Sequence, residues 1–173
     1  RAGILEDLQK NMEGYQLSVK ACIAEAEKGL LSGIHGPVSG LIKVPKQYSV
    51  AIEIALGSAA QNIVVDTDSD AKKAIRFLKA NNKGRATFLP LTSIKGRIFS
   101  EEKLDDQYGY VGMADALIDF DKKYTDVISS LLGRTGIVED IDAATTIAKK
   151  YGYRFKVVSL DGQVVNPGGS LTG

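Results

Sequence analysis

Apolar residues recur at intervals of three and four over residues 4–28, so this segment is predicted to form one long amphipathic helix. Gly29 follows it and suits a helix stop. Two interpretations are open: the helix packs on its own domain, or it is the end of a coiled coil whose second strand lies elsewhere. The stripe consists of Ile4, Leu8, Met12, Tyr15, Val19, Cys22 or Ile23, and Ala26.

Shorter periodic segments after residue 48 alternate between helix and strand. Helical spacing occurs over residues 49–60, 69–82, 113–117, 124–133 and 142–151. Runs rich in valine and isoleucine predict strands over residues 62–66, 85–91, 135–140, 154–160 and 163–166. The remaining stretch up to about residue 112 is mainly polar. This order predicts an α+β fold with small mixed sheets.

An internal repeat links two parts of this pattern. The stretches "LGSAAQNIVVDTDSDAKKAI" and "LGRTGIVEDIDAATTIAK" share the order Leu-Gly, strand, Asp-x-Asp, helix. Each copy then continues to an arginine and a strand ending in leucine, at residues 85–91 and 154–160. The repeat predicts two similar α/β lobes related by an approximate two-fold axis. The matched positions are Ile63, Val64, Asp66, Asp68 and Ala74 with Ile137, Val138, Asp140, Asp142 and Ala148.

Composition narrows the class of protein without identifying it. With 173 residues, 44% hydrophobic and 25% charged, the chain resembles an ordinary globular protein with a real core. A formal net charge of +1 gives no overall reason to expect nucleic acid. The single cysteine, Cys22, excludes an internal disulfide framework and fits a reducing compartment. Charges interrupt every long apolar run, so no transmembrane helix or signal peptide is predicted.

Two motifs invite a chemical interpretation. An apolar strand followed by Asp66 and Asp68 is how magnesium-dependent phosphatases of the haloacid-dehalogenase type present a nucleophile and a second carboxylate. In the alternative interpretation, Asp68 caps the next helix and Asp70 lies in its first turn. The second copy repeats the acids at Asp140 and Asp142, which favours the structural role. His35 lies between glycines and is interpreted as a turn residue. The nearby glycines, at 29, 33, 36 and 40, match neither a phosphate-binding loop nor a dinucleotide motif.

Charge is unevenly distributed along the chain. Residues 72–97 include eight basic residues and no acidic one, whereas residues 101–126 contain eight acidic residues against three lysines. A basic helix face usually meets only solvent, but it can also bind nucleic-acid phosphates without sequence preference. The candidates for such a patch, on one predicted helix face, are Lys72, Arg76, Lys79 and Lys83.

The chain ends with "VVNPGGSLTG", in which glycines follow a predicted strand. Such glycines suit either a terminal turn or a strand whose backbone approaches another chain closely. The chain begins without methionine and stops within this glycine cluster, so we expect it to be part of a longer protein.

Taken together, these stretches resemble the hinge domain of bacterial SMC (structural maintenance of chromosomes) proteins, which are condensin-type chromosome ATPases. The resemblance covers nearly all 173 residues. The stretches that establish it together are "GIHGPVSGLI", "YSVAIEIALGSAAQNIVVD", "AKKAIRFLKANNKGRATFLPL", "VISSLLGRTGIVED" and "VVNPGGSLTG".

The resemblance implies a fold and its divisions. An SMC hinge has two similar lobes and sits between two coiled-coil segments of one chain. We therefore expect residues 1–29 to be the end of a coiled-coil arm and residues 30–173 to be the hinge. Lobe one is expected over about 30–112 and lobe two over about 113–173.

The same resemblance implies a function. The hinge forms a homodimer in which each first lobe meets the partner's second lobe, through the glycine-rich segment. The expected interface residues are Gly168, Gly169, Ser170, Leu171, Thr172 and Gly173. Replacing both Gly168 and Gly169 by a bulky residue is then expected to give a folded monomer.

Further expectations concern chemistry and partners. The fragment is expected to have no catalytic residue, metal or cofactor, since the family's nucleotide site lies on the ATPase heads. Weak, non-specific DNA binding is expected, with kleisin and accessory subunits at the heads of the full-length protein. The expected location is cytoplasmic and nucleoid-associated. The alternative remains a magnesium-dependent phosphatase-like enzyme that uses Asp66 and Asp68.

Overall fold

The computed structural model describes residues 14–97 and 99–173. The chain forms two compact units. Unit 1 contains the described residues up to Ile42 together with Ser58–Ile94, and unit 2 contains Lys43–Gly57 and Lys95–Gly173. These bounds differ from the expected lobes at 30–112 and 113–173. The difference arises because helix α3 (Ser49–Leu56) packs beside strand β8 (Lys156–Ser159), while residues 110–113 pair within the second sheet.

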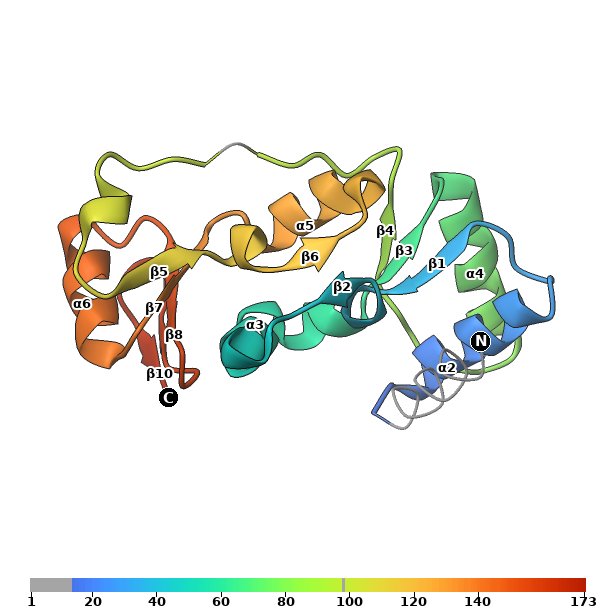
Figure 1. Ribbon diagram of the computed structural model, residues 1–173. Helices are drawn as coiled ribbons and strands as arrows, with labels where there is room; N and C mark the ends of the chain where they lie inside the picture. The colour runs from blue at the N-terminus through green and yellow to red at the C-terminus, as the bar shows by residue number, and fades with distance from the viewer. Residues whose placement is uncertain (1–13, 98) are drawn as a thin grey trace. The chain divides into compact units, whose positions relative to one another are not determined.

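Unit 1 is a three-stranded sheet with two helices (Figure 1). The sheet order is β1-β3-β4, in which β1 is antiparallel and β4 parallel to the central strand. Valine and isoleucine fill the central strand, which is buried along its whole length. The elements are α2 (Leu17–Glu27), β1 (Ile34–Pro37), β3 (Ile63–Val65), α4 (Asp68–Ala80) and β4 (Phe88–Pro90), with 3-10 helices η1 (Val38–Gly40) and η3 (Gly57–Gln61) alongside; η3 begins at the last residue of a unit 2 segment.

Helix α2 forms part of the core of unit 1. Its residues Val19, Cys22 and Ile23 are buried in one cluster with Ile63 of β3 and Leu78 of α4. The expectation of one helix over 4–28 is wrong at residues 14–16, where the chain forms a turn before Leu17. The part of that expectation over residues 4–13 lies outside the described residues. From Leu17 onward the helix packs on its own unit, while the coiled-coil arm expected over residues 1–29 stays a prediction.

Unit 2 has a five-stranded sheet in the order β10-β9-β8-β7-β5. The central pair β7 and β8 is parallel, and the other neighbours are antiparallel. Helix α6 covers one face, where Ile147 packs on Val138 and Val157. The elements of this unit are η2 (Lys46–Tyr48), α3, η4 (Leu104–Asp106), β5 (Tyr110–Met113), η5 (Ala114–Leu117), β6 (Asp119–Phe120), η6 (Lys122–Tyr124), α5 (Thr125–Leu132), β7 (Thr135–Val138), α6 (Ile141–Lys150), β8, β9 (Val164–Val165) and β10 (Leu171–Thr172). A further short strand, β2 (Ile42–Lys43), spans the boundary, since Ile42 ends the first segment of unit 1 and Lys43 begins unit 2.

The repeat seen in the sequence extends further in the order of elements. From β1 to β4 the chain forms strand, 3-10 helix, strand, 3-10 helix, helix, strand, helix and strand; apart from the extra η3, β5 to β8 follow the same order. Both copies also have a β-bulge at the equivalent place in their first strand. It lies between Ile34 and Gly36 in β1 and between Tyr110 and Gly112 in β5. Strands β1 and β5 were not predicted because their glycines interrupt the apolar alternation.

One detail of the predicted repeat is shifted. The sequence matched Arg85 with Arg154, which makes Phe88 in the first copy equivalent to Val157 in the second. In the structure, Ile63 pairs with Phe88, whereas its counterpart Ile137 pairs with Val158. The two final strands are therefore displaced by one residue relative to the sequence match. The cause is the difference between the connections 81–87 and 151–155, which a repeat based on the first strand and helix does not detect.

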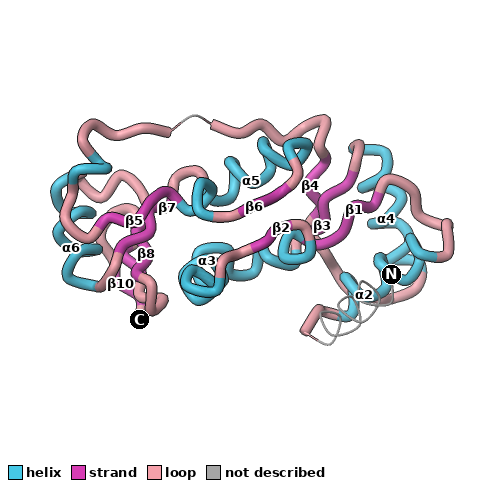
Figure 2. The backbone as a smooth tube through the Cα atoms, viewed as in Figure 1, coloured by secondary structure: helices cyan, strands magenta, loops and turns pink. Residues whose placement is uncertain are grey.

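The connection between β4 and β5 is long and mostly irregular (Figure 2). From Lys95 onward it belongs to unit 2 and is attached there by several contacts. Gly96 N–H donates to Asp126 Oδ1 at 3.0 Å, and Ser129 Oγ donates to the carbonyl of Arg97 at 3.0 Å. The buried Leu104 joins the core under α6. The sequence analysis described this stretch only as polar, and it did not predict these contacts.

The burial of Cys22 leads to a test of the unit 1 core. Burial raises the pKa of this thiol to about 11, which leaves very little thiolate at pH 8. We expect alkylation of the native chain to be slower than that of the urea-unfolded chain by at least about 100-fold. The measurement is the rate of iodoacetamide modification at pH 8, followed by mass spectrometry. Equal rates in the two states would show that α2 does not cover the thiol.

Candidate functional site

The C-terminal segment forms a hairpin whose last strand lies at the edge of the unit 2 sheet. Asn166 N–H donates to the carbonyl of Ser170 at 2.8 Å, and the Asn166 side chain donates to Thr172 Oγ1 at 3.2 Å. Strand β10 pairs with β9 on one side only, with Leu171 opposite Val165. The Leu171 side chain is 60% exposed. An apolar residue on an open strand edge marks this hairpin as a candidate contact surface.

The glycines of the hairpin have a local structural reason. Gly168 and Gly169 have φ values of +90° and +110°, which residues with a Cβ rarely adopt. A Cβ added at Gly168 would meet no atom of the described chain within 4 Å. Backbone conformation therefore already requires glycine here, whatever lies beyond the edge. A bulky substitution at either position would distort the turn as well as any contact surface.

The two sheets differ at the edge next to their parallel pair. In unit 2, strand β8 has β9 and then β10 beyond it. In unit 1, the corresponding strand β4 is the last of its sheet in the part of the chain described. Pro90 ends β4, and proline suits an edge because it has no N–H to donate. Among the described residues, β4 thus ends the unit 1 sheet on the side away from β1, and β10 ends the unit 2 sheet on the side away from β5.

The predicted basic patch is only partly placed as expected. Lys72, Arg76 and Lys79 are exposed on α4, and none lies within 4.0 Å of a carboxylate among the described residues. Lys83 does not share this helix face, since α4 ends at Ala80 and Lys83 lies half-buried in the following turn. The helix stops early because Asn82 takes a left-handed conformation, with φ 53°.

The hydrogen bonds at the start of α4 explain the acidic residues in its first turn. Thr67, not Asp68, is the N-cap: its hydroxyl accepts from the Asp70 N–H at 3.1 Å, and the Asp70 carboxylate accepts from the Thr67 N–H at 3.2 Å. This is a capping box. Ser32 also donates to Asp70 at 3.0 Å. Gly33 lies against the same carboxylate, where a Cβ would come within 2.2 Å of Asp70 Oδ2.

Asp66 and Asp68 are separated by their partners. The His35 ring nitrogen lies 2.6 Å from Asp66 Oδ1, while Asp68 Oδ1 accepts from the Ser93 hydroxyl at 2.5 Å. In the second copy, Asp140 is the N-cap of α6 and accepts from the Ala143 N–H at 2.8 Å. The described residues contain no group of three or more His, Cys, Asp or Glu side chains arranged to hold a metal ion.

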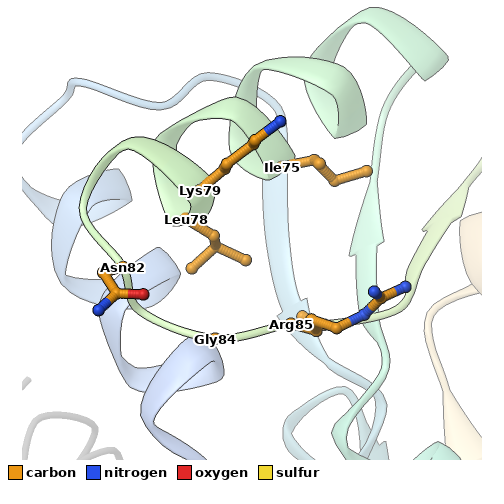
Figure 3. Close-up of a pocket in the computed structure, with 7 residues that line it drawn as sticks. Ile75, Leu78, Lys79, Asn82, Gly84 and Arg85 are labelled. Atoms are coloured by element: carbon orange, nitrogen blue, oxygen red, sulfur yellow. The ribbon is translucent and has the colours of Figure 1, made fainter.

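A groove lies between the end of α4 and the segment that leads into β4 (Figure 3). Ile75 and Leu78 of the helix line it, and Ile75 is 50% exposed. Lys79 and Arg85 add positive charge at the groove. The sequence prediction omitted Arg85 and Ile75, although the gap between α4 and β4 in the pattern was the signal for a turn here.

Within the described residues, no helix combines the length and apolar character needed to cross a membrane.

Comparison with known proteins now places the chain. The sequence profile described as "SMC proteins Flexible Hinge Domain" matches residues 31–148. The chain belongs to the SMC hinge family. It is 44% identical to the chromosome partition protein Smc of Desulfitobacterium hafniense and 43% identical to that of Bacillus subtilis, over 98% of this chain in each case. The hinge spans 14% of the length of these two relatives.

Solved structures agree with this assignment of the hinge. The crystal structure of an asymmetric dimer of the Geobacillus stearothermophilus SMC hinge domain matches with a TM-score of 0.91 and 44% identity, over 98% of this chain and 69% of that one. The Pyrococcus furiosus Smc hinge domain with an extended coiled coil matches with a TM-score of 0.77 and 30% identity, over 99% and 61% of the two chains. The predicted SMC-hinge fold is therefore confirmed.

The capping box gives a stability test for the hinge helix α4. We expect Thr67→Ala to lower the free energy of unfolding by about 1 kcal/mol, since it removes the hydroxyl that satisfies a helix N–H. Thr67→Ser keeps that hydroxyl and is the matched control. Asp68→Asn should cost less than about 0.5 kcal/mol, because Asp68 is not the cap. Urea unfolding measures all three, and a larger loss for Asp68→Asn would return the capping role to Asp68.

Proposed function

We propose that this hinge is a non-catalytic dimerisation module that joins two coiled-coil arms of a chromosome partition protein. The family assignment supports this function, and one solved relative is described as a dimer. The observation that most favours it is the exposed edge strand β10 with Leu171 on it. An open strand edge can pair with another strand by backbone hydrogen bonds, which need little sequence specificity.

The two open edges suggest how the dimer forms. Strand β10 of one copy would pair with the β4 edge of its partner, which lacks the strands that follow β8 in unit 2. Each copy has one edge of each kind, so two such pairings close a two-fold dimer without leaving either edge free. The interface would then contain Gly168, Gly169, Ser170, Leu171, Thr172 and Gly173. The glycines would shape the hairpin, and Leu171 would supply apolar burial.

Leu171→Asp tests this interface more cleanly than a glycine substitution. Wild type is expected to have a mass of about twice 18.5 kDa by light scattering. The variant should dissociate at least about 30-fold more readily, because it loses the burial of a leucine and buries a charge instead. Because Leu171 is exposed within one chain, the variant should stay folded by circular dichroism.

The matched control is Leu30→Asp, which changes a similarly exposed leucine in the turn after α2. It should remain a dimer. The interface assignment is wrong if Leu171→Asp stays as tightly dimeric as wild type, or if both variants dissociate alike.

We also propose that the hinge binds DNA weakly and without sequence preference through Lys72, Arg76, Lys79 and Lys83. The exposed cations of α4, which have no carboxylate beside them among the described residues, support this role. Lys83 is the weakest member because it is half-buried outside the helix. The small net charge of +1 favours modest affinity.

Changing all four residues to glutamate tests the DNA proposal. Loss of about four phosphate contacts should reduce the slope of log K against log salt by about 3 to 4 on duplex DNA. The measurement is a salt titration by fluorescence anisotropy on short duplex and single-stranded DNA. Lys122 and Lys123, which lie among the acidic residues of unit 2, provide a control pair for substitution by glutamate. An unchanged affinity and slope in the quadruple variant would exclude the patch.

The role of the whole protein follows from the same proposal. The relatives that the chain matches are much longer, so the ATPase heads, kleisin and accessory subunits would belong to parts of the protein outside this hinge. Such a protein would act in the cytoplasm on the nucleoid, and the hinge would join its two arms.

A further inference from the structure

An ion pair between Glu101 and Arg154, here called the latch, holds the connection between β4 and β5 (the connector) to the rest of unit 2. The connector residue Glu101 accepts from Arg154 twice: from Nε to Oε1 at 3.0 Å and from Nη2 to Oε2 at 2.8 Å. Two residues earlier, Phe99 lies under the guanidinium of Arg134, 4.8 Å from its ring centre, and packs edge-on against Phe155. Phe99 and Glu101 thus both contact side chains of unit 2.

The two arginines of the latch are tied together. Arg134 Nη2 donates to the backbone carbonyl of Arg154 at 3.1 Å, which fixes one arginine against the other. The pKa of Glu101 is lowered, chiefly by the hydrogen bond from Arg154 and further by the charges of Arg154 and Arg134. Glu101 is thus held as a carboxylate by its contact with Arg154, and the charge of Arg134 acts in the same direction.

The charges at the latch are not balanced. Glu101 is the single acidic side chain within 4.0 Å of either guanidinium in the part of the chain that is described. Two positive charges therefore share one negative charge. A pair of guanidinium groups could bind an oxyanion with two negative charges instead. Arg154 is also accessible, with 55% of its side chain exposed, whereas that of Glu101 is 18% exposed.

The backbone on both sides of the latch is unusual. Lys103, two residues after Glu101, and Tyr153, directly before Arg154, are non-glycine residues with φ of 59° and 58°. Residues with a Cβ disfavour this conformation and usually keep it only where neighbouring structure requires it. The Tyr151 hydroxyl also donates to the carbonyl of Glu102 at 2.7 Å. The contact is thus built from both sides.

We infer that Arg134 and Arg154 form an oxyanion site for a phosphate group, and that Glu101 of the connector occupies it as an internal competitor. A phosphate that displaces Glu101 would meet the fork of Arg154 and the charge of Arg134. Its binding would release the connector around Phe99 and Glu101, while the buried Leu104 would keep the later part attached. The site belongs to unit 2 and is separate from the basic face of α4.

Substitution of Glu101 tests the competition directly. Glu101→Gln keeps the size of the side chain but removes the competing charge, so inorganic phosphate should bind the variant about tenfold more tightly than wild type. Glu102→Gln is the matched control, since the neighbouring Glu102 side chain is exposed and outside the latch. The double variant Glu101→Gln with Arg154→Gln should lose the gain. Isothermal titration at constant ionic strength measures each affinity.

A second measurement uses wild type alone. Amide hydrogen exchange of residues 99–102 should become at least about fivefold faster in phosphate than in chloride of equal ionic strength, because the latch opens. Both experiments are then repeated with a short thymidylate oligonucleotide, in the variant whose four basic residues Lys72, Arg76, Lys79 and Lys83 are changed to glutamate. This comparison separates free phosphate from a nucleic-acid backbone as the source of the phosphate group. The inference fails if Glu101→Gln binds phosphate no better than wild type, or if phosphate leaves connector exchange unchanged.

Discussion

The constraint on which this structure depends is the unsatisfied edge of a β-sheet. Each strand of a sheet needs a neighbour on both sides to use all its backbone hydrogen-bonding groups, and short sheets leave a large share of them open. In unit 2 the chain continues for two strands beyond the parallel pair, and so moves the open edge out to β10. In unit 1 the sheet stops at β4. The inequality between two otherwise similar units gives a single chain two kinds of edge.

The two copies are not equally similar along their length. The central strand and following helix are alike in both, because each must bury an apolar strand under a capped helix. The caps use different means: Thr67 with Asp70 in one copy and Asp140 in the other. After the helices the connections differ, and the final strands no longer match residue for residue. The shared part of the two copies is thus the strand and helix that form each core.

Much of the fold could be predicted from the chain because its central strands and helices follow strong apolar patterns. Strands β1 and β5 escaped prediction, since their glycines at 36 and 112 leave too few side chains for an alternation. The helix prediction failed at residues 14–16 because the apolar stripe stays in phase there, although the backbone forms a turn. Of the candidate surfaces, β10 was named through family resemblance. The latch between Glu101 and Arg154 joins residues 53 apart, and no local pattern reveals such a pair.

The path of the chain has a mechanical consequence. Unit 1 is assembled from two separate stretches of sequence, and the stretch between them, Lys43–Gly57, belongs to unit 2. The chain therefore passes from one unit to the other three times, near residues 42, 57 and 94. A single break at any of these crossings leaves the units covalently connected through the remaining two. Neither unit corresponds to one uninterrupted stretch of the sequence, so neither can be expressed alone without joining separate segments.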